Sequence, residues 1–155
     1  MTLSMAACTS GNDTSSSSGS SDKKETKAGT GKIGVAMPTK DLQRWNQDGE
    51  NMKKQLEDAG YEVDLQFASN DVATQVSQVE NMVSGGCDAI VIGSIDGESL
   101  GTPLKQAEEQ GIPVISYDRL IMNSSAVTYY ATFDNYLVGQ KQGEDRKSTR
   151  LNSSH

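Results

Sequence analysis

Apolar positions follow two different periods between residues 32 and 135, and these periods predict strands separated by helices. Apolar runs of about four to eight residues are typical of strands, whereas apolar residues spaced by three and four are typical of helices. Strands are expected at residues 32–37, 62–67, 87–92, 112–117 and 127–132. The run at 87–92 is almost continuously apolar, as in strands that are covered on both faces.

Helical stripes lie between the first four strands. The first stripe consists of Trp45, Gly49, Met52, Leu56 and Ala59, and Gly60 is expected to end the helix. The second stripe consists of Val72, Val76, Val79 and Val83, with Asn70 or Asp71 as its cap and Gly85-Gly86 at its end. The third stripe consists of Leu100, Leu104 and Ala107 and ends at Gly111. A last helix is expected to begin near Asn135.

Strand and helix therefore alternate as βαβαβαβ before the fifth strand. This order predicts an α/β fold with a doubly wound, mostly parallel sheet and right-handed crossovers. Cys87 is then most simply a small core residue.

The amino-terminal segment is unlike this repeated unit. Residues 9–31 are serine-rich and charged, so they bury too little apolar surface to fold and are expected to form a disordered tether. Upstream, Met5-Ala6-Ala7-Cys8 resembles the cleavage box of bacterial lipoproteins, which implies cleavage before Cys8 and lipidation of Cys8. Residues 1–8 are too short for a complete signal peptide, so we interpret them as the end of a truncated one. A chance cysteine near the start is the alternative.

Residues 145–155 have no helical or strand period in their apolar positions. They resemble the translation of a sequencing-library adapter, which implies that native sequence stops near Glu144; a natural basic tail is the alternative. The folded domain is accordingly expected over residues 32–144.

Composition narrows the class of function. The net charge is −7 and the isoelectric point about 4.6, which argues against a nucleic-acid partner because such partners need a basic face. Apolar runs stay shorter than the roughly 18 residues of a membrane span. The two cysteines, Cys8 and Cys87, lie in different settings and predict no disulfide framework. The single histidine is His155, so histidine-based catalysis and most zinc sites are not expected, and no cofactor is indicated.

One glycine pattern suggests nucleotide binding but lies in the wrong place. Residues 29–34 match G-x-G-x-x-G, a fingerprint that must follow a strand and open a helix. Here the tether precedes the pattern and a predicted strand begins inside it. Nucleotide chemistry, and with it an oxidoreductase, is therefore not favoured.

Polar side chains gather where the predicted strands end. Arg44 and Trp45 follow the first strand, Asp96 the third and Asp118-Arg119 the fourth; Asp134 and Asn135 follow the fifth. Parallel sheets bind ligands at the carboxyl ends of their strands. Charged donors and acceptors at this edge suit adjacent hydroxyl groups, and an indole face can cover the apolar face of a sugar ring.

Each of these residues also has a simpler interpretation. Asp118 and Arg119 can form a surface ion pair, and Arg44 can be a solvated loop charge. Trp45 can be the first core residue of its helix, a role compatible with ligand contact. Asp96 and Asp134 can serve only as helix caps.

The ordered set of stretches resembles the periplasmic sugar-binding proteins of ABC importers, in particular the xylose-binding and multiple-monosaccharide-binding proteins. The resemblance covers residues 31–144 and is carried by residues 35–45, 78–83, 94–97, 117–121 and 129–135. It implies the amino-terminal lobe of a type I periplasmic-binding-protein fold, without the second lobe that closes over the sugar. It also implies sugar contacts at Arg44, Trp45, Asp118 and Arg119, with Asp134 and Asn135 near the crossing between lobes.

The implied function is capture of a monosaccharide, an aldose like xylose, glucose or galactose, for an ABC importer, without any enzymatic reaction. The partners would be the sugar, the ABC permease and the membrane, which the protein would reach through a lipid anchor at Cys8; no nucleic acid is expected. The protein would lie outside the cytoplasm, anchored to the cell membrane or in the periplasm. A sugar-sensing chemoreceptor or the ligand domain of a transcription regulator remains the alternative. A regulator would need a helix-turn-helix before residue 31, where the tether lies.

Overall fold

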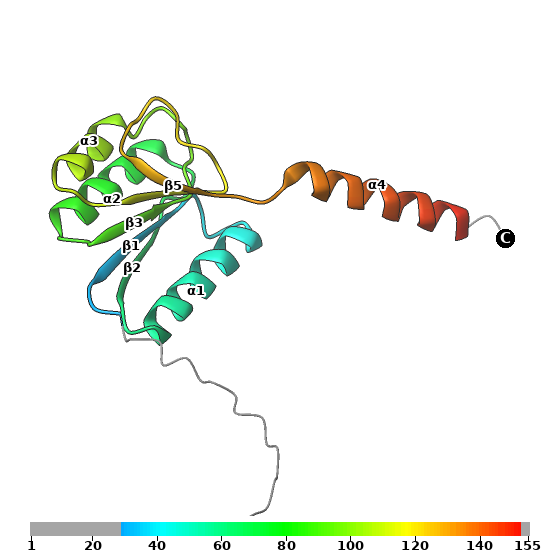
Figure 1. Cartoon of the computed structure of the whole chain (residues 1–155), viewed down its shortest axis with the longest axis horizontal. Helices are drawn as coiled ribbons and strands as arrows, with labels where there is room; N and C mark the ends of the chain where they lie inside the picture. Colours follow the sequence, from blue (N-terminus) through cyan, green and yellow to red (C-terminus); the bar gives the residue numbers. More distant parts are fainter. Residues whose placement is uncertain (1–28, 153–155) are drawn as a thin grey trace, which may run out of the picture.

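The computed structural model describes residues 29–152, which form a five-stranded sheet and four helices (Figure 1). The strands are β1 (Lys32–Met37), β2 (Glu62–Phe67), β3 (Ala89–Ile92), β4 (Val114–Tyr117) and β5 (Val127–Ala131). The helices are α1 (Gln43–Asp58), α2 (Val72–Ser84), α3 (Gly101–Glu109) and α4 (Asn135–Asn152). All neighbouring strands are parallel in the order β2-β1-β3-β4-β5. The predicted α/β class and parallel sheet are confirmed.

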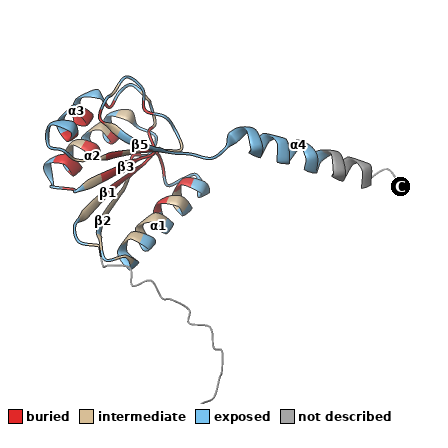
Figure 2. Cartoon of the chain, in the orientation of Figure 1, coloured by how far each residue is buried: buried red, intermediate tan, exposed pale blue. Residues whose placement is uncertain are grey.

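Helices cover both faces of the sheet, which is why the strands are largely apolar. Helix α1 packs on one face over a core that includes Val35, Met37 and Val91. Helices α2 and α3 pack on the opposite face over Ala36, Ile90, Ile92 and Val114. Successive residues of β1 therefore enter opposite layers, and both layers are buried in Figure 2.

Local sequence explains where the helices lie and end. Asp71 caps α2, its side chain accepting a hydrogen bond from the Thr74 N–H at 2.7 Å. Gly49 lets α1 approach the sheet closely, since a Cβ there would meet Phe67 Cζ at 3.0 Å. Gly60 and Gly111 follow helices with φ values of 97° and 70°, which glycine adopts without strain.

Strands β3 and β4 begin two residues later than expected, at Ala89 and Val114. The predicted tether also ends earlier than residue 31. Gly29 N–H donates to the Ala59 carbonyl at 2.6 Å, and the Gly31 carbonyl accepts from Glu62 N–H at 2.9 Å. Residues 29–31 therefore join the domain by backbone bonds, which their polar composition could not reveal.

Helix α4 projects away from the sheet in Figure 1, and its described side chains are exposed in Figure 2. It continues to Asn152, although the apolar positions of residues 145–155 show no helical period. Extending an existing helix is much less costly than starting one, so residues with high helix propensity are enough to continue it. Glu144, Arg146 and Lys147 are such residues. The origin of this segment stays a prediction.

The remaining amino-terminal predictions fall outside the described residues. They are the lipoprotein cleavage box, the lipidation at Cys8 and most of the serine-rich tether. Within residues 29–152, no helix is long and apolar enough to cross a membrane.

Candidate functional site

Asp118 lies immediately after β4 in a conformation that its neighbours fix. Its φ is 63°, a left-handed value that Asp tolerates better than most residues. Its N–H donates to the Ala131 carbonyl at 2.7 Å, and its own carbonyl accepts from Tyr130 Oη at 3.1 Å and Thr132 Oγ1 at 3.3 Å. Residues 130–132, at the end of β5, thus fix the main chain of Asp118, from which the carboxylate projects.

Arg44 joins α1 to this carboxylate. Its Nη2 donates to Asp118 Oδ1, and its Nε lies 3.6 Å from Asp48 Oδ2, one helical turn further along α1. The hydrogen bond to Asp118 is the chief reason why the pKa of Arg44 is raised. The Asp118 side chain is 14% exposed and that of Arg44 51%, so the pair lies at the rim of the domain, with the arginine facing solvent.

Trp45 lies beneath two guanidinium groups. The Cζ atom of Arg44 is 4.8 Å from the centre of the indole, and that of Arg119 is 5.2 Å away. Arg119 is also fixed by a 3.1 Å hydrogen bond from Nη1 to the Ser94 carbonyl. Trp45 itself is 3% exposed and meets Tyr117 edge-on at a centroid distance of 6.5 Å. It is therefore a core residue whose ring also supports both arginines.

The structure brings together all four residues that the sequence predicts to contact sugar: Arg44, Trp45, Asp118 and Arg119. The pairing differs from the surface ion pair considered for Asp118 and Arg119, because Asp118 binds Arg44 while Arg119 binds a backbone carbonyl. The four residues thus come from the ends of β1 and β4, and the end of β3 adds the Ser94 carbonyl that holds Arg119.

The remaining predicted positions have structural roles that account for them. Asp134 accepts from Leu137 N–H at 3.0 Å and thereby caps α4, and Asn135 is the first residue of that helix. Asp96 accepts from the N–H groups of Glu98 and Ser99, both at 2.8 Å, within the turn before α3. The expected cap role is wrong, because the N-cap position of α3 is Leu100. Beside them, the exposed Phe133 ring lies 5.8 Å from Arg44 Cζ, so the segment after β5 reaches the cluster through an aromatic side chain.

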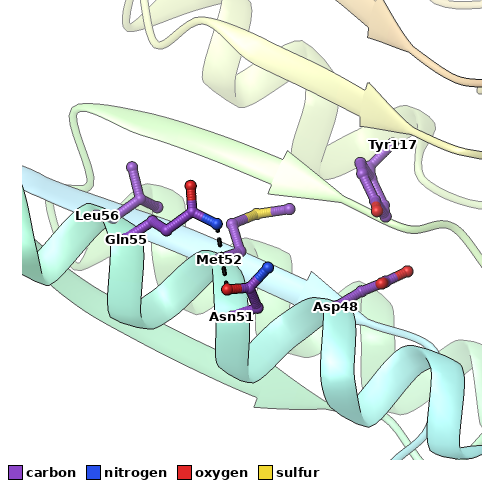
Figure 3. Close-up of a pocket in the computed structure, with 6 residues that line it drawn as sticks. All are labelled: Asp48, Asn51, Met52, Gln55, Leu56 and Tyr117. Atoms are coloured by element: carbon purple, nitrogen blue, oxygen red, sulfur yellow. Dashed lines mark hydrogen bonds between the residues drawn. The ribbon is translucent and has the colours of Figure 1, made fainter.

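A pocket of about 310 Å³ opens along α1, next to this cluster (Figure 3). Met52 and Leu56 of α1 and Tyr117 of β4 supply its apolar side chains, and Asp48 stands at the end nearest Arg44. Burial is the main reason why the pKa of Tyr117 is raised, and the Asp48 carboxylate raises it further. The four predicted sugar contacts do not line this pocket.

Two functional candidates escaped the sequence reasoning. Asp48 forms an ion pair with Arg44, and its position four residues after Arg44 on the same helix was the available signal. Gln75 is 1% exposed on α2, although the predicted stripe named only valines. A polar residue at a position spaced by four from Val79 was the available signal.

The cluster offers charged hydrogen-bond donors and an acceptor on a fixed backbone. Within the described residues, no group of three or more His, Cys, Asp or Glu side chains is placed to bind a metal ion. Charged donors and acceptors of this kind suit hydrogen bonding to a polar molecule with neighbouring hydroxyl groups.

Comparison with known proteins decides the family. The model of the periplasmic binding protein domain matches residues 33–147, which is most of the chain. The chain belongs to the periplasmic binding protein domain family. Within this family, it is 54% identical over 115 residues to the multiple sugar-binding periplasmic receptor ChvE of Rhizobium radiobacter, covering 74% of this chain and 32% of the receptor. It is 39% identical over 113 residues to the D-xylose-binding periplasmic protein of Escherichia coli, covering 73% of this chain and 34% of that protein.

A solved structure in the family is similar as well. It is an ABC transporter solute binding protein from Clostridium phytofermentans with bound β-D-glucose, 70% identical with a TM-score of 0.72. The match covers 80% of this chain and 38% of that one. The chain thus spans about a third of the length of the periplasmic binding proteins it matches.

Proposed function

We propose that residues 32–144 form the amino-terminal lobe of a sugar receptor that delivers a monosaccharide to an ABC importer. The observation that carries the proposal is the cluster of Arg44, Asp118 and Arg119 around Trp45, assembled from the segments that follow β1 and β4. Two further findings support the proposal. The chain belongs to the periplasmic binding protein domain family, and relatives are named for binding xylose or multiple sugars or hold bound glucose.

In the proposed site, Asp118 accepts hydrogen bonds from sugar hydroxyls while Arg44 and Arg119 donate to hydroxyl or ring oxygens. The Asp118–Arg44 pair can bind a ligand in this way because Arg44 is half exposed and the main chain of Asp118 is held by β5. Trp45 contributes chiefly by supporting both arginines, since its ring is 3% exposed. The preferred ligand class is an aldose similar to glucose or xylose. The protein binds its ligand without chemical conversion.

Three further parts of the proposal concern the cellular setting. The receptor acts outside the cytoplasm, as the periplasmic relatives are named to do. Lipidation at Cys8 attaches it to the membrane, and the serine-rich residues 9–28 separate the anchor from the lobe. The ABC permease is its protein partner.

The test is a chimera in which residues 33–144 replace the matching segment of the glucose-bound Clostridium phytofermentans protein. We expect the chimera to bind D-glucose in calorimetry, with D-xylose and D-galactose titrated in parallel. The 155-residue chain alone should bind much more weakly, because a single lobe cannot enclose a ligand. A folded chimera that binds none of the three sugars would refute the proposal.

A further inference from the structure

Gln75 connects α2 to the loop that follows β3. Its Nε2 donates to the Gly93 carbonyl at 3.0 Å, and its Oε1 accepts from the Ile95 N–H at 2.9 Å. The side chain is 1% exposed, so an amide that lost these bonds would remain buried and unsatisfied. One side chain therefore fixes the loop at two points, on either side of Ser94.

The same loop contacts the proposed sugar site in two places. The Ser94 carbonyl, which lies between the two anchored residues, accepts the hydrogen bond from Arg119 Nη1 at 3.1 Å. Gly93 lies directly against the indole, because a Cβ at this position would be 3.2 Å from Trp45 Cζ3. A shift of the loop would displace Arg119 and loosen the packing around Trp45 together.

We propose that Gln75 is a positioning residue for the sugar site, acting through residues 93–95 on Arg119 and Trp45. Its side-chain hydrogen bonds go to the loop backbone, at Gly93 and Ile95. Its amide fixes the Ser94 carbonyl, and that carbonyl fixes the guanidinium over the indole. The part of this inference that concerns sugar affinity rests on the proposed function.

Trp45 supplies a direct readout, because it is the one tryptophan of the 155-residue chain. In that chain we expect Gln75→Met to move the Trp45 emission to longer wavelength and to increase its quenching by acrylamide. Arg119→Met should produce a similar change. The double variant should show less change than the sum of the two single variants, since both substitutions release the same guanidinium.

Gln78 provides the matched control. It lies on the same helix, and its Nε2 also donates to a backbone carbonyl, that of Phe67 on β2, at 3.1 Å. Gln78→Met should leave the Trp45 spectrum unchanged. If Gln75→Met loses the far-ultraviolet circular dichroism of the fold, Gln75→Asn replaces it. Its amide is one methylene shorter and cannot reach both backbone partners as Gln75 does, so it should give a change of the same sign.

The glucose affinity of the chimera is the second measurement. Gln75→Met should weaken it about tenfold, the equivalent of one lost hydrogen bond to a charged group, and Gln78→Met should not. The inference is overturned if folded Gln75 variants keep the parent spectrum, if Gln78→Met gives the same change, or if Gln75→Met and Arg119→Met are fully additive. A parent chimera without glucose binding would refute the proposed function and leave the fluorescence test intact.

Discussion

Asp118→Asn in the glucose-binding chimera separates the role of the carboxylate in recognition from its role in stability. Asparagine tolerates left-handed backbone, so the variant retains the φ of 63° and the main-chain hydrogen bonds to β5. Only the charge and one acceptor are lost. Because Arg44 is 51% exposed and screened by solvent, we expect the free energy of unfolding to fall by no more than about 1 kcal/mol.

The effect on sugar affinity should be much larger. A hydrogen bond to a charged group contributes about 1.5–3 kcal/mol, and about 1.4 kcal/mol corresponds to a factor of ten. We therefore expect Asp118→Asn to weaken glucose binding by roughly 10- to 150-fold in calorimetry. Asp118→Ala should bind as weakly and also lose about 1–2 kcal/mol of stability, because alanine is strained in left-handed backbone.

Asp88→Asn is the control for this experiment. Asp88 precedes β3 at the amino edge of the sheet, where its carboxylate accepts from Lys32 N–H at 2.7 Å. Its replacement should leave glucose affinity unchanged. Glucose affinity of Asp118→Asn within twofold of the parent, or a loss matched by an equal loss in the Asp88 variant, would refute the assignment of Asp118 as a sugar contact.

Two predictions concern the stability of the domain itself. Leu104→Ala should lower the free energy of unfolding by about 2–5 kcal/mol in urea denaturation, because Leu104 is fully buried between α3 and the sheet. Leu42→Ala is the control at an exposed position and should change the free energy of unfolding by less than about 0.5 kcal/mol. Equal effects of the two substitutions would contradict the two-layer core. The hydrogen bonds from Thr74 lower the pKa of Asp71, so its stabilisation of α2 is present above the unfolded pKa of about 4 and is lost as pH falls through the lower folded pKa. Asp71→Ala should accordingly lower the melting temperature at pH 7, with a smaller difference near pH 2, and a difference independent of pH would contradict this role.

The strands could be predicted because their apolar runs are bounded by glycines and polar turns. The bounds of β1 and β2 were predicted to the residue, and β3 and β4 were shortened at residues 87–88 and 112–113. Parallel topology followed from the alternation of strands with helices, and parallel topology alone placed Arg44, Asp118 and Arg119 at one edge. This part of the site depends on the order of strands and helices along the chain, which the pattern of apolar and polar residues predicts.

Side-chain pairing within the site could not be predicted in the same way. Nothing in the pattern indicated that Asp118 would bind Arg44 rather than its neighbour, because that choice depends on the angle of α1 against β4. The role of Gln75 required knowledge that α2 faces the loop after β3. The extent of α4 was missed because a solvated helix needs no apolar period.

The strand order β2-β1-β3-β4-β5 has a consequence for biosynthesis. Among the described strands β1 comes first in the sequence, β2 pairs on one side of it, and β3, β4 and β5 then add one after another on the other side. Each new strand therefore finds its partner already in place when it leaves the ribosome, and no strand must be inserted between two that have already paired. The sheet can grow outward in step with translation, in the order in which the residues are made.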